Sequence, residues 1–117
     1  VTIVKVKPGD RFIVPKEYYH LTINTGDKPF IFSDIISTIS GGDYSLLKEK
    51  KGAPILIFKD INGGIRLDWN QNYLPVEKIR ICDVDSLPWE QPFTIDGPLY
   101  ESFLADPEKF KILAKPY

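Results

Sequence analysis

The sequence has few of the residues that most often carry catalysis or cross-linking: one cysteine, Cys82, one histidine, His20, and no methionine. A single cysteine excludes an intrachain disulfide and fits a reducing compartment, so we expect the protein in the cytoplasm. No apolar run approaches the roughly 20 residues of a membrane-spanning helix. The net charge of -1 at pH 7 gives no broad basic surface for nucleic acid. We therefore expect neither a membrane nor nucleic acid as a partner.

What the sequence does contain is the composition of a folded globular chain, with 43% hydrophobic and 26% charged residues among 117. The prolines are unevenly spread, because six of the 10 lie beyond residue 74. This change in proline content predicts a β-rich domain over residues 1–72 and a proline-rich extension over residues 73–117.

Strand signals dominate the first part of the chain. Alternating residues and runs of β-branched or aromatic residues predict strands at residues 2–7, 12–14, 19–25 and 30–39. The last of these runs is apolar enough to be buried on both faces for part of its length.

A helix and a hairpin are predicted next. Asp43 is a suitable N-cap for a short helix over residues 44–51. Residues 54–59 and 65–69 then form the two strands of a hairpin around Asn62-Gly63, since Asn-Gly is the strongest short hairpin signal.

The extension carries weaker signals. Residues 78–84 predict one strand, and residues 86–98 are expected to be extended and irregular. Asp106 followed by Pro107 is a favourable helix start, so we expect a short helix through Leu113.

One spacing of residues points to chemistry. Gly9, Pro15, His20 and Asn24 are separated as in the second conserved motif of the cupin superfamily, G-x5-P-x-G-x2-H-x3-N, which this segment resembles. Glu17 departs from the motif, which usually has glycine there. Gly9 allows a turn into one strand, Pro15 stops that strand, and the chain returns in a second strand.

The returning strand would carry the functional side chains. Because strand side chains alternate, Tyr18, His20, Thr22 and Asn24 are expected on one face. If that face is a barrel interior, the His20 imidazole is placed to bind a divalent metal. The alternative is a hydrogen-bonded histidine in the core or at the rim.

A closer resemblance covers residues 3 to about 70. The stretch H-L-T-I-N-T-G-D-K-P-F-I-F at residues 20–32, and Gly42-Asp43-Tyr44 before a short helix, are similar to archaeal cupin-type phosphoglucose isomerases. The resemblance implies a homodimeric cupin barrel that holds iron, manganese, nickel or zinc and interconverts glucose 6-phosphate and fructose 6-phosphate.

The expected fold is therefore mainly β. We expect the C-terminal half of a cupin-like jelly-roll barrel, with a short helix after the motif and a proline-rich tail that carries a helix. A half barrel has open strand edges, which proteins normally cover. We expect these edges to be covered by further residues of a longer chain, by a segment or subunit carrying the first cupin motif, or by a second copy in a homodimer.

The sequence also departs from that family. Its first motif supplies two histidines and a glutamate to the metal, and a chain with one histidine cannot contain the His-x-His pair. Ile36 stands where the family has a tyrosine, and Gly42 where it has a histidine, whereas Tyr44 matches. No catalytic residue is assigned, and we expect that this polypeptide alone is not a competent isomerase.

Candidate site residues follow from the motif and the resemblance. The substrate-binding candidates are Tyr44, Tyr18, Thr22 and Phe32, and the metal ligands are His20 and, as a further candidate, Asp34. Each has a plainer alternative: the tyrosines, Tyr19 included, as packing residues, and Asp34 as a hydrated rim residue. Cys82, Trp69 and Trp89 are expected to be structural.

Three functions stay open at this point. The chain is part of a sugar-phosphate isomerase, a degenerate cupin that binds a sugar or metabolite without turnover, or an interaction module whose tail is the working surface.

Overall fold

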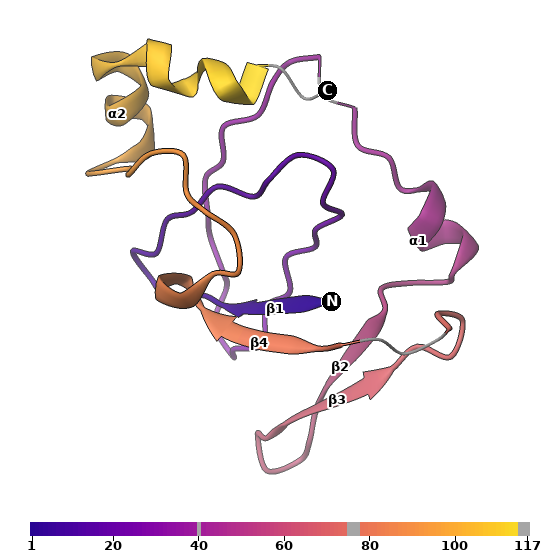
Figure 1. The fold of residues 1–117 in the computed structure, drawn as a ribbon. Coiled ribbons are helices and arrows are strands. Elements are labelled where there is room, and N and C mark those ends of the chain that lie inside the picture. Colours follow the sequence, from indigo (N-terminus) through magenta and orange to yellow (C-terminus); the bar gives the residue numbers. More distant parts are fainter. Residues whose placement is uncertain (40, 75–77, 115–117) are drawn as a thin grey trace. The chain divides into compact units, whose positions relative to one another are not determined.

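The computed structural model describes residues 1–39, 41–74 and 78–114, and consists of short strands and helices joined by long irregular segments (Figure 1). In chain order the elements are β1 (Thr2–Lys5), α1 (Ser45–Glu49), β2 (Ile55–Lys59), β3 (Ile65–Trp69), β4 (Arg80–Asp83), the 3-10 helix η1 (Val84–Ser86), α2 (Leu99–Ala105) and the 3-10 helix η2 (Pro107–Ala114). β1 pairs with β4 and β2 pairs with β3, so the described strands form two sheets of two strands each. None of the helices in these ranges has the length and apolar character needed to cross a membrane.

The predicted mainly β architecture is seen only in part. The described ranges hold two small sheets and several short helices, and no closed barrel. The strands expected at residues 12–14, 19–25 and 30–39 are wrong, because these segments are irregular. β-forming residues make a strand only where neighbouring backbone accepts and donates their hydrogen bonds. The apolar run at 30–39 is also not buried, since Ile31 is 90% and Ile36 68% exposed.

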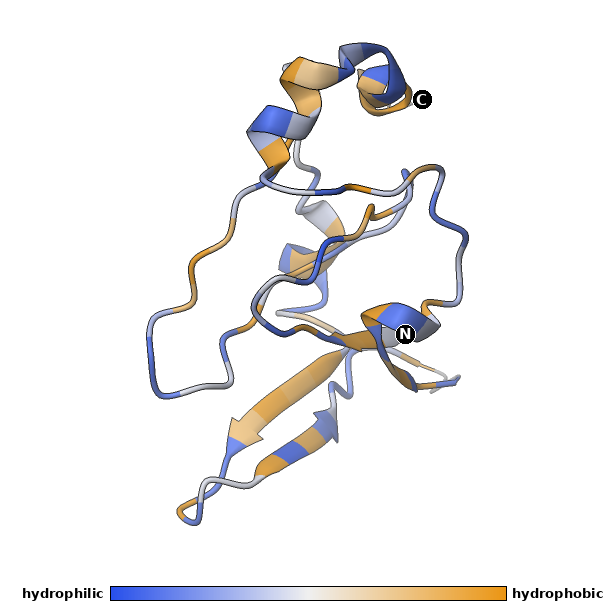
Figure 2. Ribbon diagram, turned by 90° about the vertical axis from the view of Figure 1, so that its left-hand side faces the viewer, coloured by the Kyte–Doolittle hydropathy of each residue, from blue (hydrophilic) through white to orange (hydrophobic). Residues whose placement is uncertain are grey.

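The β2–β3 hairpin confirms the prediction made from Asn62-Gly63. The strands are antiparallel, with Ile55 opposite Trp69 and Lys59 opposite Ile65. Gly63 adopts a φ of 81°, which glycine reaches without a steric penalty. The carboxylate of Asp60 accepts hydrogen bonds from the backbone N–H groups of the turn residues Asn62 and Gly64, both at 2.8 Å. Figure 2 shows β2 apolar along most of its length, whereas apolar and polar residues alternate along β3.

The predicted helix after the glycine pair is confirmed as α1, although its cap lies one residue later than expected. Tyr44 occupies the N-cap position, and Asp43 accepts a hydrogen bond from the Ser45 N–H at 2.9 Å. The helix ends at Glu49, and two residues with positive φ follow its C-cap, Lys51 with φ 55° and Gly52 with φ 124°. The Gly52 N–H closes the end by donating to the Leu47 carbonyl at 2.8 Å.

A buried asparagine joins α1 to the hairpin. Asn70 is 5% exposed, and its side-chain N–H₂ group donates to the carbonyls of Lys50, at 3.1 Å, and Ala53, at 3.0 Å. Its side-chain oxygen accepts from the Asn72 N–H at 3.0 Å, and its backbone N–H donates to the Pro54 carbonyl at 2.8 Å. One residue therefore satisfies polar groups from the end of the helix and from both ends of the hairpin.

The tail forms two helical segments where one was predicted. The predicted start at Asp106 is confirmed, since its carboxylate accepts from the Lys109 N–H at 3.4 Å, but the segment that follows is the 3-10 helix η2. The preceding helix α2 was not predicted. Phe110, 4% exposed, packs edge-on against Phe93 and Phe103, with ring centroids 5.0 and 5.5 Å away. These three rings form the small core of the tail.

The described residues divide into two compact units. The first contains residues 1, 21–30 and 42–80, and the second contains residues 2–20, 31–41 and 81–117. The hairpin and Asn70 belong to the first unit, whereas the motif up to His20 and the helical tail belong to the second. A boundary near residue 72 stays a prediction.

Candidate functional site

The turn that opens the motif forms as the spacing predicts. Gly9 has a φ of 91°, and the Asp10 N–H donates to the Lys7 carbonyl at 3.1 Å. The Asp10 carboxylate accepts in return from the Lys7 N–H at 2.7 Å. The chain therefore reverses direction at this turn, which begins the motif segment (residues 9–24).

Glu17 occupies the motif position that is usually glycine, and its backbone keeps the conformation that glycine favours. Its φ is 69°, in the left-handed region. An L-residue with a β-carbon pays roughly 1–2 kcal/mol there, because the β-carbon approaches the following carbonyl oxygen. The backbone at this position thus has the φ that a glycine would favour, although the flanking strands of the motif do not form.

We expect Glu17→Gly to raise the free energy of unfolding by about 0.5–1 kcal/mol, since the relief of the left-handed penalty exceeds the extra chain entropy that glycine adds to the unfolded state. Urea unfolding at neutral pH measures it. Glu17→Ala is the control, because alanine keeps the β-carbon and should give no gain. A Glu17→Gly protein no more stable than Glu17→Ala would show that the turn is not strained.

His20 is exposed, and its Nδ1 atom lies 3.4 Å from the carbonyl oxygen of Tyr18. Throughout the described part of the chain, no group of three or more His, Cys, Asp and Glu side chains gathers to hold a metal ion. Asp34, the further candidate ligand, is exposed rather than buried. The residues present therefore do not fit a metal by themselves, since tight binding needs several ligands in a fixed geometry.

The four substrate-binding candidates are also exposed, and they are divided between the two units. Tyr18 and Phe32 belong to the second unit with His20 and Asp34, whereas Thr22 and Tyr44 belong to the first. The shared face expected for residues 18 to 24 does not form, because no strand is present there to impose alternation. Their roles in binding stay predictions.

Tyr44 has a specific relation to Gly42, the position at which the resembling family carries a histidine. A β-carbon added to Gly42 would lie 2.7 Å from Cε2 of the Tyr44 ring, closer than real side chains approach. Glycine at this position therefore lets the ring fold back over the backbone. The Gly42 departure and the Tyr44 match are linked, since a larger residue at 42 would displace the ring.

Residues of the tail form hydrogen bonds with the motif segment. The sequence indicated Trp89 as a structural residue but did not predict this contact. The Trp89 indole N–H donates to the Ile13 carbonyl at 2.9 Å, and the centroids of the Trp89 and Tyr18 rings are 5.7 Å apart. The Gln91 amide contacts both backbone groups of Ile13: it accepts from the N–H at 2.6 Å and donates to the carbonyl at 3.2 Å. Gln91 thus supplies the hydrogen bonds that a neighbouring strand would supply. Cys82 is buried in β4, consistent with a packing role.

Comparison with known proteins links this chain to one protein family. The model of the glucose-6-phosphate isomerase (GPI) family matches residues 1–78. The glucose-6-phosphate isomerase of Thermococcus onnurineus is 43% identical over 54 residues, which are 46% of this chain and 29% of that protein. That of Thermococcus litoralis is 41% identical over 54 residues, 46% of this chain and 28% of the relative. That of Pyrococcus horikoshii is 38% identical over 64 residues, 55% of this chain and 33% of the relative.

The matched region spans a third or less of the length of these curated relatives. No solved structure matches the chain. The motif from Gly9 to Asn24, the hairpin and Tyr44 all lie within the residues that the family model matches.

Proposed function

This chain belongs to the glucose-6-phosphate isomerase family, and we propose that it provides the second-motif half of a cupin barrel in a metal-dependent isomerase of that kind. The observation that carries the proposal is the family match over residues 1–78, which includes the complete spacing from Gly9 to His20 and Asn24. The left-handed φ of Glu17, 69°, supports it, because the motif turn persists without its glycine.

His20 is proposed as one ligand of a divalent metal, iron, manganese, nickel or zinc. The other ligands would come from a segment that carries the first cupin motif, since the described residues contain no group of three or more His, Cys, Asp and Glu side chains that could hold a metal ion. Such a metal, when bound, polarises a substrate carbonyl. Isomerisation also needs a base that moves a proton between neighbouring carbons, and we assign no residue of this chain to that step.

The proposed substrate is a sugar phosphate, and Tyr44, Tyr18, Thr22 and Phe32 are the proposed contacts. Tyr44 is 57% exposed, so its hydroxyl is accessible to a hydroxyl or phosphate oxygen of a ligand. The proposed partner is a segment carrying the first motif or a second copy of the chain. Support comes from the exposed apolar side chains of residues 31–39, because an exposed apolar surface of this kind marks an interaction site.

The metal content of a joined protein tests this proposal. We would connect this chain through a Gly/Ser linker to a segment carrying the first cupin motif, and measure metal per chain after exposure to Mn²⁺ or Ni²⁺. We expect close to one metal ion per chain and at least a tenfold weaker affinity in His20→Ala, because an imidazole ligand is lost. The matched control Tyr44→Phe should keep the metal. Unchanged metal binding in His20→Ala would sink the assignment of His20.

A second candidate is a binding module that holds a sugar phosphate without turnover. Gly42 and Ile36, which replace a histidine and a tyrosine of the resembling family, favour it. This alternative predicts that glucose 6-phosphate raises the melting temperature of the protein while no fructose 6-phosphate forms.

A further inference from the structure

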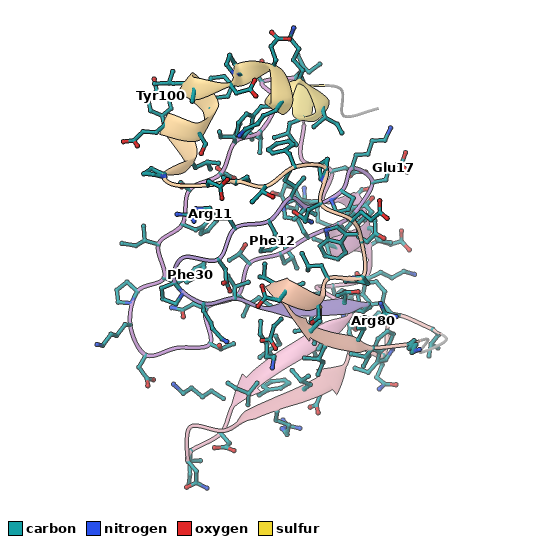
Figure 3. All side chains as sticks on the ribbon, turned by 60° about the vertical axis from the view of Figure 1, so that its left-hand side comes forward. Arg11, Phe12, Glu17, Phe30, Arg80 and Tyr100 are labelled. Atoms are coloured by element: carbon teal, nitrogen blue, oxygen red, sulfur yellow. The ribbon has the colours of Figure 1, made fainter. Side chains whose placement is uncertain are left out.

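A pocket lies between the motif segment and the tail, within the second compact unit. Its volume is about 130 Å³, and it is lined by Arg11, Phe12, Gln91, Phe93, Thr94 and Ile95. Figure 3 labels Arg11 and Phe12, which lie beside the segment that leads into α2. Four of the lining residues lie beyond residue 78, where the family match ends. Most of the pocket lining therefore lies outside the residues that the family model matches.

The walls of the pocket combine apolar and polar surface in about equal parts. Phe12, Phe93 and Ile95 are half-buried and present two aromatic rings and one aliphatic side chain. Phe93 is held in place because its ring packs edge-on against Phe110, which is 4% exposed. A ligand with an apolar body would bury its surface here, at a gain of roughly 25 cal/mol per Å².

Three side chains of the lining carry polar groups, and two of them are available to a ligand. The side-chain amide of Gln91 is occupied on both sides by the backbone of Ile13. Arg11 forms no ion pair with any acidic side chain in the described ranges, and it is exposed. The Arg11 guanidinium and the Thr94 hydroxyl therefore have no hydrogen-bond or ion-pair partner among the described residues, and both can contact a ligand.

From this combination we propose that the pocket binds a small monocarboxylate with a single-ring or similarly sized apolar body. A guanidinium presents two parallel N–H donors that match a carboxylate, and one positive charge suits one negative charge. A cavity of about 150 Å³ accepts a benzene ring, so a pocket of about 130 Å³ limits the apolar body of the ligand to about one ring, which would contact the phenylalanines. A sugar phosphate has no apolar body to place there. The site is distinct from the proposed metal centre and does not depend on it.

Titration of the full chain with benzoate, followed through backbone amide NMR signals, tests the proposal. Benzamide is the probe control, because it has nearly the same shape and no charge. We expect benzoate to shift the signals of Phe12, Phe93 and Thr94, and to bind about tenfold more tightly than benzamide, since hydrogen bonds to an ionised group are the stronger ones.

Variants distinguish the contribution of the Arg11 guanidinium to benzoate binding from that of the overall surface charge. Arg11→Gln should weaken benzoate about tenfold and leave benzamide unchanged, whereas Arg11→Lys should give an intermediate loss because it keeps the charge without the paired donors. Arg80→Gln removes a guanidinium that does not line the pocket, and it should leave benzoate binding unchanged. If Arg11→Gln fails to fold, the comparison of benzoate with benzamide on the unmodified chain still decides. Equal binding of the two probes, signal changes away from the pocket, or an Arg11→Gln protein that binds benzoate normally would each overturn the proposal.

Discussion

Replacing Asn70 with alanine should lower the free energy of unfolding by about 3 kcal/mol. The side chain is 5% exposed and makes three hydrogen bonds, to Lys50, Ala53 and Asn72. Alanine would leave the Ala53 carbonyl and the Asn72 N–H without their side-chain partner, and the Lys50 carbonyl would keep only the Asn72 side chain. Each unsatisfied buried group costs roughly 1–3 kcal/mol. Urea unfolding followed by tryptophan fluorescence measures the loss.

Asn72→Ala is the matched control for Asn70. The Asn72 side chain donates to the same Lys50 carbonyl, at 3.1 Å, but it is exposed. Water replaces an exposed hydrogen bond, so this variant should lose only about 0.5 kcal/mol. Equal losses in the two variants would show that burial of Asn70 is not what makes the network important.

Asn70→Asp extends the test to pH. An ionised carboxylate only accepts hydrogen bonds, so it would face the two carbonyls of Lys50 and Ala53 with repulsion. Protonation restores one donor and is therefore favoured in the folded variant. The destabilisation should be largest at neutral pH, where the carboxyl is ionised in the unfolded chain, and should shrink as the pH falls towards about 3, where the carboxyl is mostly protonated in both states. Equal destabilisation at both pH values would contradict this account of the contacts.

The second large effect is expected at Trp89, whose replacement by alanine should cost about 2–3 kcal/mol of unfolding free energy. The ring is half-buried, it packs against Tyr18, and its indole N–H donates to Ile13. Removal of a large aromatic residue loses both the burial and the contacts of its neighbours. Trp89→Phe keeps most of the ring and should lose only about 1 kcal/mol, the contribution of one hydrogen bond.

Amide hydrogen exchange shows whether the tail holds the motif segment locally. The Ile13 N–H donates to the Gln91 side chain at 2.6 Å. In Gln91→Ala, exchange at Ile13 should accelerate at least tenfold, while amides of the β2–β3 hairpin keep their protection. If Ile13 exchanges at the same rate with and without Gln91, the tail does not act as the missing strand partner.

Local chemistry accounts for the parts of the fold that the sequence predicted. Asn62-Gly63 specified the hairpin, the Gly9 turn formed as the motif requires, and Asp106 marked the start of η2. Each signal acts through its immediate neighbours in the chain, so a single sequence carries it. Glu17 is different, because its departure from the usual glycine predicted no backbone conformation, and the left-handed φ of 69° is a finding of the structure.

The failures involve partners that are distant in the sequence. The run at residues 30–39 has strong β propensity, yet propensity does not provide the neighbouring strand that would complete its hydrogen bonds. Gln91 reaches Ile13 across 78 positions, and no local pattern marks a glutamine as a backbone partner. The prediction of the site was limited in the same way. The motif indicated His20 as a candidate ligand, which stays a prediction, but a shared face with Thr22 required a strand that the described residues do not form.

The central claim is that this chain supplies one necessary part of an isomerase site and is not sufficient by itself. It is tested most directly by conversion of glucose 6-phosphate to fructose 6-phosphate with Mn²⁺ or Ni²⁺ present. We predict no conversion by the chain alone, metal-dependent conversion by the protein joined to a first-motif segment, and loss of that conversion in its His20→Ala variant. Conversion by the chain alone, or a folded and metal-loaded joined protein that converts nothing, would contradict the claim.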